Sequence, residues 1–190
     1  MKISQNNNVS LIPDKPFDTK YINKAIFFDR DGILNKLVFG RPPWEISEIE
    51  IFNESWKLLE IAKEFSYIPV IITNQPDAAR GSVDLDNLNK INSFICNKLD
   101  IKFSYICNHG EDGICHCRKP SPGMIFKASK DLKINLSKSF LIGDREKDIQ
   151  AGFYAGCRTI YKSKSRIKLA DYCVPDHQSL TKLLIKLLSK

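Results

Sequence analysis

Short apolar runs alternate along this chain with segments in which apolar residues recur at helical spacing. This alternation restricts the possible fold more than any other feature. The runs are three to five residues long and read as buried strands, and most of them end in polar residues. They cover residues 25–28, 68–72, 103–106, 139–142, 158–161 and 172–174. Strand–helix alternation predicts an α/β fold in which a parallel sheet carries helices on both faces.

Helices are predicted in the intervening segments. Three of them cover about residues 54–66, 146–155 and 180–188. Asp84 is expected to cap a further helix that runs through Leu99 and has Leu85 on its apolar face. Ser121 is expected to cap the helix that follows the third strand, with Pro122 at its first position.

The length of 190 residues suits one domain with a substantial core. We assign residues 21–190 to that domain and the polar, aperiodic residues 1–20 to a loose N-terminal arm. No apolar run approaches the roughly 20 residues that span a bilayer, and residues 1–20 lack the apolar core of a signal peptide. We therefore expect a cytoplasmic monomer with no membrane partner.

The charge is positive overall, because 29 basic residues face 22 acidic ones and leave a net charge of +7. Such an excess favours an anionic partner, such as a phosphate ester or a nucleic acid. A solvated, lysine-rich surface accounts for the same charge equally well, since the lysines are spread along the chain. Charge alone therefore leaves the partner open.

Two carboxylates, Asp29 and Asp31, follow the first apolar run, and Gly32 then allows the backbone to turn close to a ligand. Carboxylates this close repel each other, and a divalent cation between them relieves the repulsion. An oxygen-rich site of this kind suits Mg²⁺. One carboxylate could attack a phosphorus atom while the other transfers a proton. A strand that simply ends in an Asp-rich turn is the alternative.

Other polar groups follow the second and third strands, at the edge where open α/β sheets bind ligands. Thr73, Asn74 and Gln75 offer neutral hydrogen-bond donors to phosphate oxygens. Arg118 and Lys119 precede a helix whose macrodipole disfavours positive charge, which indicates a functional pair of phosphate-binding cations. A turn or capping role for the first three, and an exposed basic turn for the last two, are the alternatives.

Asp144 and Arg145 follow the fourth strand. Asp144 can reach the same edge as Asp29 and complete a metal site. Asp148 lies one helical turn later, where it is expected to be either an N-terminal helix charge or a partner of Lys119.

The loop of residues 107–117 gathers the ligands of a predicted zinc site, namely Cys107, His109, Cys115 and Cys117. Three thiolates and one imidazole suit tetrahedral Zn²⁺, and four protein ligands indicate a structural role. Such a site would hold the loop that leads directly into the two cations. His116 could replace His109, but it lies between two ligands and is expected to face solvent. A chance cluster or a redox pair is the alternative.

Taken in order, the motifs at Asp29, Thr73, Lys119 and Asp144 resemble the four motifs of the haloacid dehalogenase superfamily of phosphatases, over about residues 24–162. The resemblance implies a Rossmann-like fold. It implies that Asp29 is the nucleophile and that Asp31 is the general acid and base. Thr73 and Lys119 would hold the transferring phosphoryl group. Asp29, Asp144 and the backbone carbonyl of Asp31 would bind Mg²⁺.

The cysteine cluster next to Arg118 resembles the branch of heptose bisphosphate phosphatases and histidinol-phosphatases, which lack a large cap domain. This resemblance implies a phosphorylated sugar as substrate, with a D-glycero-D-manno-heptose 1,7-bisphosphate losing its 7-phosphate as the favoured reaction. The substrate would contact Asn74, Gln75, Arg118 and Arg145. No nucleic acid partner is expected.

Two segments depart from the pattern of that branch. They are Pro76-Asp77, after the second strand, and residues 41–44, after the first. The departures leave the substrate open, so histidinol phosphate and other small phosphomonoesters remain alternatives. A polynucleotide 3′-phosphatase would need aromatic residues near a basic groove, and the chain shows no clear alternation of that kind. A non-catalytic, zinc-stabilised anion-binding module is the alternative from another class.

Overall fold

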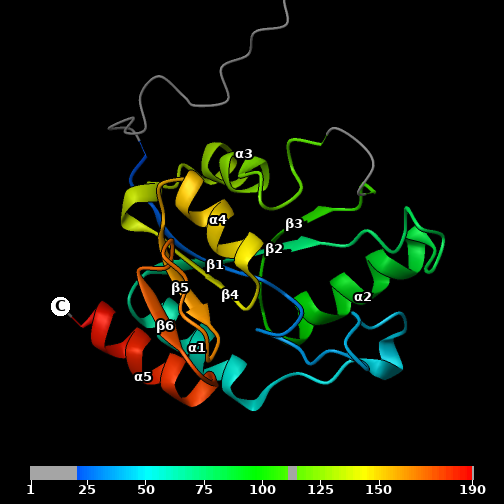
Figure 1. Cartoon of the computed structure of the whole chain (residues 1–190), viewed down its shortest axis with the longest axis horizontal. Coiled ribbons are helices and arrows are strands. Elements are labelled where there is room, and N and C mark those ends of the chain that lie inside the picture. The colour runs from blue at the N-terminus through cyan, green and yellow to red at the C-terminus, as the bar shows by residue number, and fades with distance from the viewer. Residues whose placement is uncertain (1–20, 111–114, 190) are drawn as a thin grey trace, which may run out of the picture.

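The computed structural model describes residues 21–110 and 115–189, so the predicted N-terminal arm of residues 1–20 lies outside the described residues. Six strands form one parallel sheet in the order β3-β2-β1-β4-β5-β6 (Figure 1). The strands are β1 (Lys24–Phe28), β2 (Tyr67–Asn74), β3 (Phe103–Cys107), β4 (Phe140–Gly143), β5 (Arg158–Lys162) and β6 (Tyr172–Val174). The predicted parallel sheet is confirmed, with β1 between β2 and β4.

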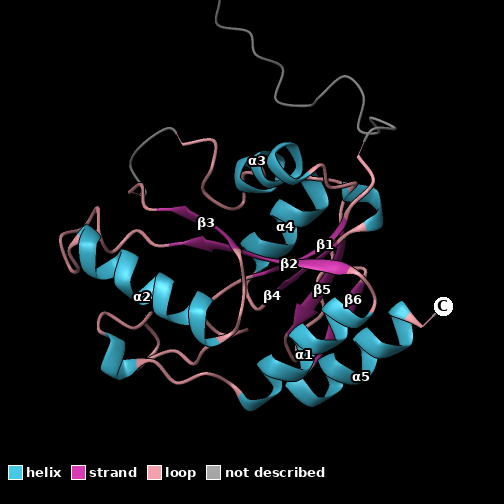
Figure 2. Cartoon of the chain, turned by 180° about the vertical axis from the view of Figure 1, so that it is seen from behind, coloured by secondary structure: helices cyan, strands magenta, loops and turns pink. Residues whose placement is uncertain are grey.

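Helices pack against both faces of the sheet, as predicted (Figure 2). One face is covered by α1, α2 and α5, and the other by α3 and α4. The helices are α1 (Asn53–Glu64), α2 (Leu85–Lys98), α3 (Gly123–Leu132), α4 (Glu146–Tyr154) and α5 (His177–Leu188), with short 3₁₀ helices η1 (Ile46–Glu48) and η2 (Leu136–Lys138).

The side chains of β1 alternate between two separate apolar clusters. Ile26 and Phe28 pack with α1, α2 and α5, whereas Ala25 and Phe27 pack with α3 and α4. All four residues are fully buried. A parallel strand buried on both faces reads as an unbroken apolar run, which is why its sequence shows no polar alternation.

Helix α2 begins where the sequence predicts, because the Asp84 carboxylate accepts a hydrogen bond from the Asn87 N–H at 2.7 Å. The expectation that Leu85 lies on the apolar face is wrong, since its side chain is 50% exposed. Leu85 is the first residue of the helix, and burial begins one turn later at Leu88.

The predicted cap of α3 is also wrong. The helix begins at Gly123, with Pro122 at the capping position and no side-chain cap. The Gly123 N–H donates to the carbonyl of His116 at 3.1 Å, and a Cβ on Gly123 would lie 2.2 Å from that oxygen. The backbone of the preceding loop thus takes the role expected of the Ser121 hydroxyl.

Two loops border the carboxyl edge of the sheet. They are the β1–α1 loop (residues 29–52) and the β2–α2 loop (residues 75–84). In the described part of the chain neither loop forms a separate domain. Among the described helices, none is long and apolar enough to cross a membrane.

Candidate active site

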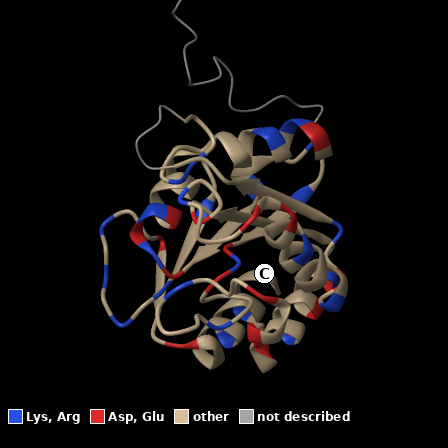
Figure 3. Ribbon diagram, turned by 90° about the vertical axis from the view of Figure 1, so that its right-hand side faces the viewer, with Lys and Arg blue, Asp and Glu red and all other residues tan. Residues whose placement is uncertain are grey.

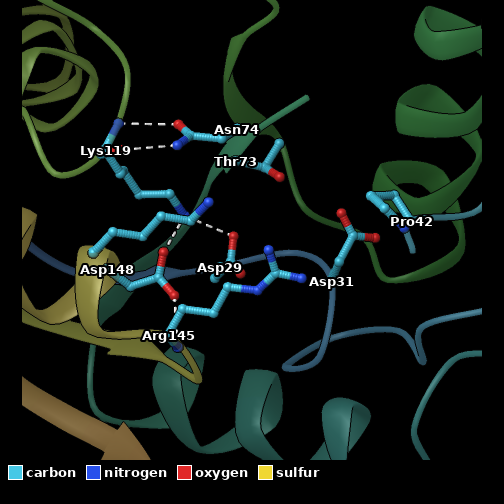
Figure 4. Close-up of a pocket in the computed structure, with 9 residues that line it drawn as sticks. Asp29, Asp31, Pro42, Thr73, Asn74, Lys119, Arg145 and Asp148 are labelled. Carbon is cyan, nitrogen blue, oxygen red and sulfur yellow. Dashed lines mark hydrogen bonds and ion pairs between the residues drawn. The ribbon is translucent and has the colours of Figure 1, made fainter. Parts of the chain in front are cut away.

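The carboxyl ends of the three central strands bring the predicted site residues together (Figure 4). Asp29 follows β1, Thr73 lies near the end of β2, and Asp144 follows β4. Lys119 reaches the same edge from the loop before α3. The pocket there is lined by Asp29, Asp31, Pro42, Thr73, Asn74, Lys119, Arg145, Lys147 and Asp148. This is the edge at which an open α/β sheet binds its ligands.

Lys119 joins the buried charges of the site. Its Nζ lies 2.7 Å from Asp29 Oδ1 and 2.7 Å from Asp148 Oδ1. It also donates to the Ile72 carbonyl at 2.9 Å. Burial disfavours the charged form, but Asp148 and Asp29 outweigh this effect and raise the pKa of Lys119. The side chain therefore stays an ammonium.

The carboxylates of the site are short of positive charge. Burial, followed by repulsion from Asp148, raises the pKa of Asp29 to about 7, although Lys119 opposes the shift. Burial and Asp148 also raise the pKa of Asp144. A further cation would therefore stabilise the ionised forms of both groups.

Asp31 is held by three side chains. Arg30 donates to it at 3.0 Å, Asn35 at 2.9 Å and Gln75 at 2.6 Å. The Gln75 amide also donates to the Thr73 hydroxyl at 2.8 Å. Gln75, expected to contact substrate, thus uses its amide nitrogen to orient two neighbouring side chains.

Asn74 holds the peptide group of Lys119 from both sides. Its side-chain amide donates to the Lys119 carbonyl at 3.0 Å and accepts from the Lys119 N–H at 3.0 Å. Asn74 also lines the pocket, where it was expected to contact substrate. It therefore has a second role, which is to position the Lys119 backbone.

Three carboxylates could hold a metal ion. Asp29, Asp144 and Asp148 each offer an oxygen within 4.8 Å of the others. Asp144 Oδ1 is buried and has no hydrogen-bond partner among the described residues. Leaving such an oxygen unpaired is costly, and a hard cation with oxygen ligands would satisfy it. The donor set therefore fits a divalent cation.

Asp148 is the residue whose place the sequence defined least. It forms an ion pair with Lys119, which was one of the two roles expected from the sequence. It also accepts a hydrogen bond from the Arg145 N–H at 3.0 Å, so it serves as the negative charge expected at the N-terminus of α4 as well. Its membership of the carboxylate group was missed. The available signal was its place in the first turn of the helix that directly follows Asp144.

Gly32 allows the chain to pass close to Asp144. Its φ of +89° is one that L side chains rarely adopt, and a Cβ there would lie 2.0 Å from Asp144 Oδ2. The Gly32 carbonyl accepts a hydrogen bond from Lys162 Nζ. The turn after β1 is thus shaped around the Asp144 carboxylate.

The predicted zinc ligands lie together (residues 111–114 of this loop are outside the described part). Cys107, His109, Cys115 and Cys117 each offer a donor atom within 4.8 Å of the others. The Cys115 sulfur lies 3.6 Å from that of Cys107 and 2.9 Å from that of Cys117, with no disulfide between them. His109 Nδ1 lies 3.1 Å from the Cys115 sulfur, whereas His116 is exposed. This donor set fits a tetrahedral Zn²⁺.

The two predicted substrate arginines lie in different surroundings. Arg145 lines the pocket. Arg118 is not among the lining residues, and its guanidinium donates to the His109 carbonyl at 3.1 Å, which ties it to the zinc-ligand loop. Lys147, which the sequence did not single out, lines the pocket together with Arg145.

Comparison with known proteins agrees with this geometry. The family model described as HAD-hydrolase-like matches residues 116–165, which include Lys119 and Asp144. The D-glycero-beta-D-manno-heptose-1,7-bisphosphate 7-phosphatase of Helicobacter pylori (strain ATCC 700392 / 26695) is 35% identical over 139 residues, 70% of this chain and 79% of that protein. This chain belongs to the haloacid dehalogenase-like hydrolases. The D-glycero-alpha-D-manno-heptose-1,7-bisphosphate 7-phosphatase of Photorhabdus laumondii is 37% identical over 145 residues, which cover 70% of this chain and 78% of that protein.

A solved structure of a haloacid dehalogenase-like hydrolase has the same fold. The D,D-heptose 1,7-bisphosphate phosphatase from B. bronchiseptica, complexed with magnesium and phosphate, superposes with a TM-score of 0.76. The match has 25% sequence identity and covers 86% of this chain and 99% of that one. The predicted family and its Rossmann-like fold are confirmed.

The two segments expected to depart from the pattern of the heptose bisphosphate phosphatase and histidinol-phosphatase branch contact each other. The Trp44 indole N–H, on the β1–α1 loop, donates to Asp77 Oδ2 on the β2–α2 loop at 3.0 Å. Arg41 lies over the Trp44 ring at 4.0 Å and pairs with Glu48 at 2.6 Å. Asp77 is buried. The two loops therefore form one wall, and Pro42 in that wall lines the pocket.

Proposed function

We propose that this chain is a Mg²⁺-dependent phosphatase that removes one phosphate from a phosphorylated sugar through an aspartyl-phosphate on Asp29. The observation that carries the proposal is the arrangement around Lys119. A buried ammonium lies 2.7 Å from a strand-end carboxylate, in a pocket that also contains Thr73 and a second carboxylate, Asp31.

In the first step, an Asp29 oxygen attacks phosphorus and the bond from phosphorus to the sugar oxygen breaks. Asp31 protonates the departing sugar oxygen. In the second step, Asp31 takes a proton from a water molecule, whose oxygen attacks phosphorus and displaces Asp29. Inorganic phosphate leaves, and both carboxyl groups return to their starting states.

The other groups position and stabilise charge. Lys119 and the Thr73 hydroxyl would hold the oxygens of the transferring phosphoryl group. Asn74 fixes the Lys119 backbone, and Gln75 orients Asp31. These contacts support a site that is organised before substrate enters.

Mg²⁺ would be held by Asp29, Asp144 and the backbone carbonyl of Asp31, with Asp148 beside them. The unpaired Asp144 Oδ1 supports this assignment. When bound, the ion supplies positive charge that offsets repulsion between the attacking carboxylate and the phosphate. Zn²⁺ would be held by Cys107, His109, Cys115 and Cys117 in a structural role.

The favoured substrate is a D-glycero-D-manno-heptose 1,7-bisphosphate, losing the 7-phosphate. Support comes from the names of the relatives that match 70% of this chain. A non-catalytic anion-binding module has less support, because in Figure 3 basic residues are interspersed with acidic ones over the visible ribbon rather than gathered in one patch.

The test is phosphate release with and without Mg²⁺ from four compounds: the α and β anomers of the heptose bisphosphate, histidinol phosphate and a 3′-phosphorylated oligonucleotide. We expect the highest kcat/KM on a heptose bisphosphate, and only with Mg²⁺. Preference for histidinol phosphate would move the function to that alternative. Release from none of the compounds would contradict the proposal.

A further inference from the structure

The pocket holds more cations than one transferring phosphoryl group requires. Lys119, Arg145 and Lys147 all line it. Lys119, whose ammonium contacts Asp29, Asp148 and the Ile72 carbonyl, is the cation assigned above to the transferring phosphoryl group. Arg145 and Lys147 form no ion pair with any carboxylate within the described residues. Two cations thus border the pocket with no carboxylate at ion-pair distance in that part of the chain, although Asp148 lies near enough to Lys147 to favour its charged form.

The position of Lys147 is unfavourable for the fold alone. It is the second residue of α4, where the helix macrodipole disfavours positive charge. Arg145, which adds repulsion, immediately precedes the same helix. The side chain of Lys147 is half-buried against the pocket. A local arrangement that costs stability at a ligand-binding edge is typical of a functional position.

We propose that Lys147, beside Arg145, binds the phosphate of the substrate that is not transferred. The inference rests on the proposed function and adds a binding residue to it. Lys147 carries a compact positive charge, and Arg145 carries a planar fork that can contact two phosphate oxygens at once. The sequence suggested Arg118 and Arg145 as the two substrate-binding cations. Arg118 donates to the His109 carbonyl instead, so Lys147 is the residue we assign beside Arg145.

The test compares Lys147→Gln with the wild type on heptose 1,7-bisphosphate and on 4-nitrophenyl phosphate, which has no second phosphate. The variant should lose roughly 10-fold or more in kcat/KM on the bisphosphate, because a charge-assisted contact is lost. It should change little on the aryl phosphate. Lys147→Arg should restore most of the loss, since it keeps the charge.

A second readout measures binding directly. Heptose 1-phosphate, the product that keeps the second phosphate, should inhibit aryl phosphate hydrolysis by the wild type and inhibit the Lys147→Gln variant more weakly. Lys182→Gln is the matched control, because Lys182 is exposed on α5 and does not line the pocket. It should behave as the wild type in both assays.

Two outcomes would overturn the inference while the proposed function stands. One is an equal loss on both substrates, which would give Lys147 a role in the chemistry or the fold. The other is a wild-type kcat/KM on the bisphosphate together with unchanged product inhibition. Failure of the wild type to release phosphate from any compound is a different result and would contradict the proposed function itself.

Discussion

At the scale of single residues, the site contains more carboxylates than cations. Four carboxylates, those of Asp29, Asp31, Asp144 and Asp148, lie close to two buried cations, Arg30 and Lys119. Burial, followed by repulsion from Asp148, raises the pKa of Asp29 to about 7. The folded state holds this proton more tightly than the unfolded chain does. The stability that the protonated Asp29 contributes is therefore full below a pH of about 4, where the unfolded chain is also protonated, and is lost as the pH rises to about 7.

Asp29→Asn should abolish turnover and raise the melting temperature in metal-free buffer at pH 8. The amide cannot attack phosphorus, but it removes one buried negative charge. A shift of one pKa unit corresponds to about 1.4 kcal/mol of unfolding free energy. Removing that cost would raise the melting temperature by roughly 3–6 °C for a domain of this size. Differential scanning fluorimetry and phosphate release check the two parts.

Mg²⁺ is the control for that experiment. It should raise the melting temperature of the wild type and have a smaller effect on Asp29→Asn, because one ligand has lost its charge. A variant that melts below the wild type in metal-free buffer would show that the Lys119 contact outweighs the burial of Asp29.

Gly32→Ala should reduce phosphatase activity and Mg²⁺ affinity strongly. The added Cβ would meet Asp144 Oδ2 at 2.0 Å, so the turn or the carboxylate must move. Gly81→Ala is the matched control, since Gly81 also has a positive φ of +74° but an added Cβ meets nothing within 4 Å. Both variants share the backbone strain, and only Gly32→Ala should lose activity and Mg²⁺ binding. Equal behaviour of the two would reject the steric argument.

Sequence reasoning at this scale depended on what each residue type can do. The places of Asp29, Asp31 and Thr73 at the strand ends followed from the apolar runs before them. The double use of Asp148 did not, because one side chain both accepts from the start of α4 and pairs with a lysine 29 positions earlier. Only the packing of α4 against β4 brings those partners together.

At the scale of elements, two loops act as one wall. The hydrogen bond from the Trp44 indole to buried Asp77 joins the β1–α1 loop to the β2–α2 loop. These are the two segments expected to depart from the pattern of the heptose bisphosphate phosphatase and histidinol-phosphatase branch, and the contact makes them neighbours in the fold. The sequence singled out each segment but could not predict the contact between them, because Trp44 and Asp77 are 33 positions apart.

Trp44→Phe should weaken sugar bisphosphate binding without changing the chemistry. Loss of a hydrogen bond to a charged group costs about 1.5–3 kcal/mol when the partner stays buried, and only part of that would reach the pocket. We expect KM for the bisphosphate to rise several-fold and kcat on 4-nitrophenyl phosphate to stay unchanged. Trp56→Phe is the control, since Trp56 is 42% exposed on α1. A similar KM in both variants would mean that the wall does not shape the pocket.

The zinc-ligand loop is the second element with a testable role. Cys115→Ser should lower zinc content from about one ion per chain towards none and reduce the melting temperature, because the site replaces a core that so short a loop cannot build. Elemental analysis and calorimetry check this. Ser165→Ala, at an exposed residue outside the loop, should change neither. Full zinc content in Cys115→Ser would contradict the structural role.

Element positions were predictable from periodicity, but helix starts were less so. Asp84 caps α2 through its own side chain, which is local information. The start of α3 depends instead on the His116 carbonyl, seven residues before Gly123. Capping by a distant backbone group leaves no residue pattern of its own.

At the scale of the whole molecule, the order of the strands creates the site. With β1 between β2 and β4, the groups from these strand ends converge, and Lys119 joins them from the loop after β3. Alternation of strands and helices predicted a parallel sheet, but it did not give the order β3-β2-β1-β4-β5-β6. That order depends on how helices divide between two faces, which no local pattern records.

The central claim is that Asp29 carries the phosphoryl group during turnover. The most direct measurement is mass spectrometry of the Asp29 peptide after acid quench of the reaction with heptose 1,7-bisphosphate and Mg²⁺. We expect one phosphoryl group on Asp29 of the wild type. In Asp31→Asn this species should accumulate when 4-nitrophenyl phosphate is the donor, because that leaving group needs no acid and the variant lacks the base for hydrolysis. Rapid phosphate release with no phosphorylated Asp29 in either protein, or with the phosphoryl group on another residue, would contradict the account.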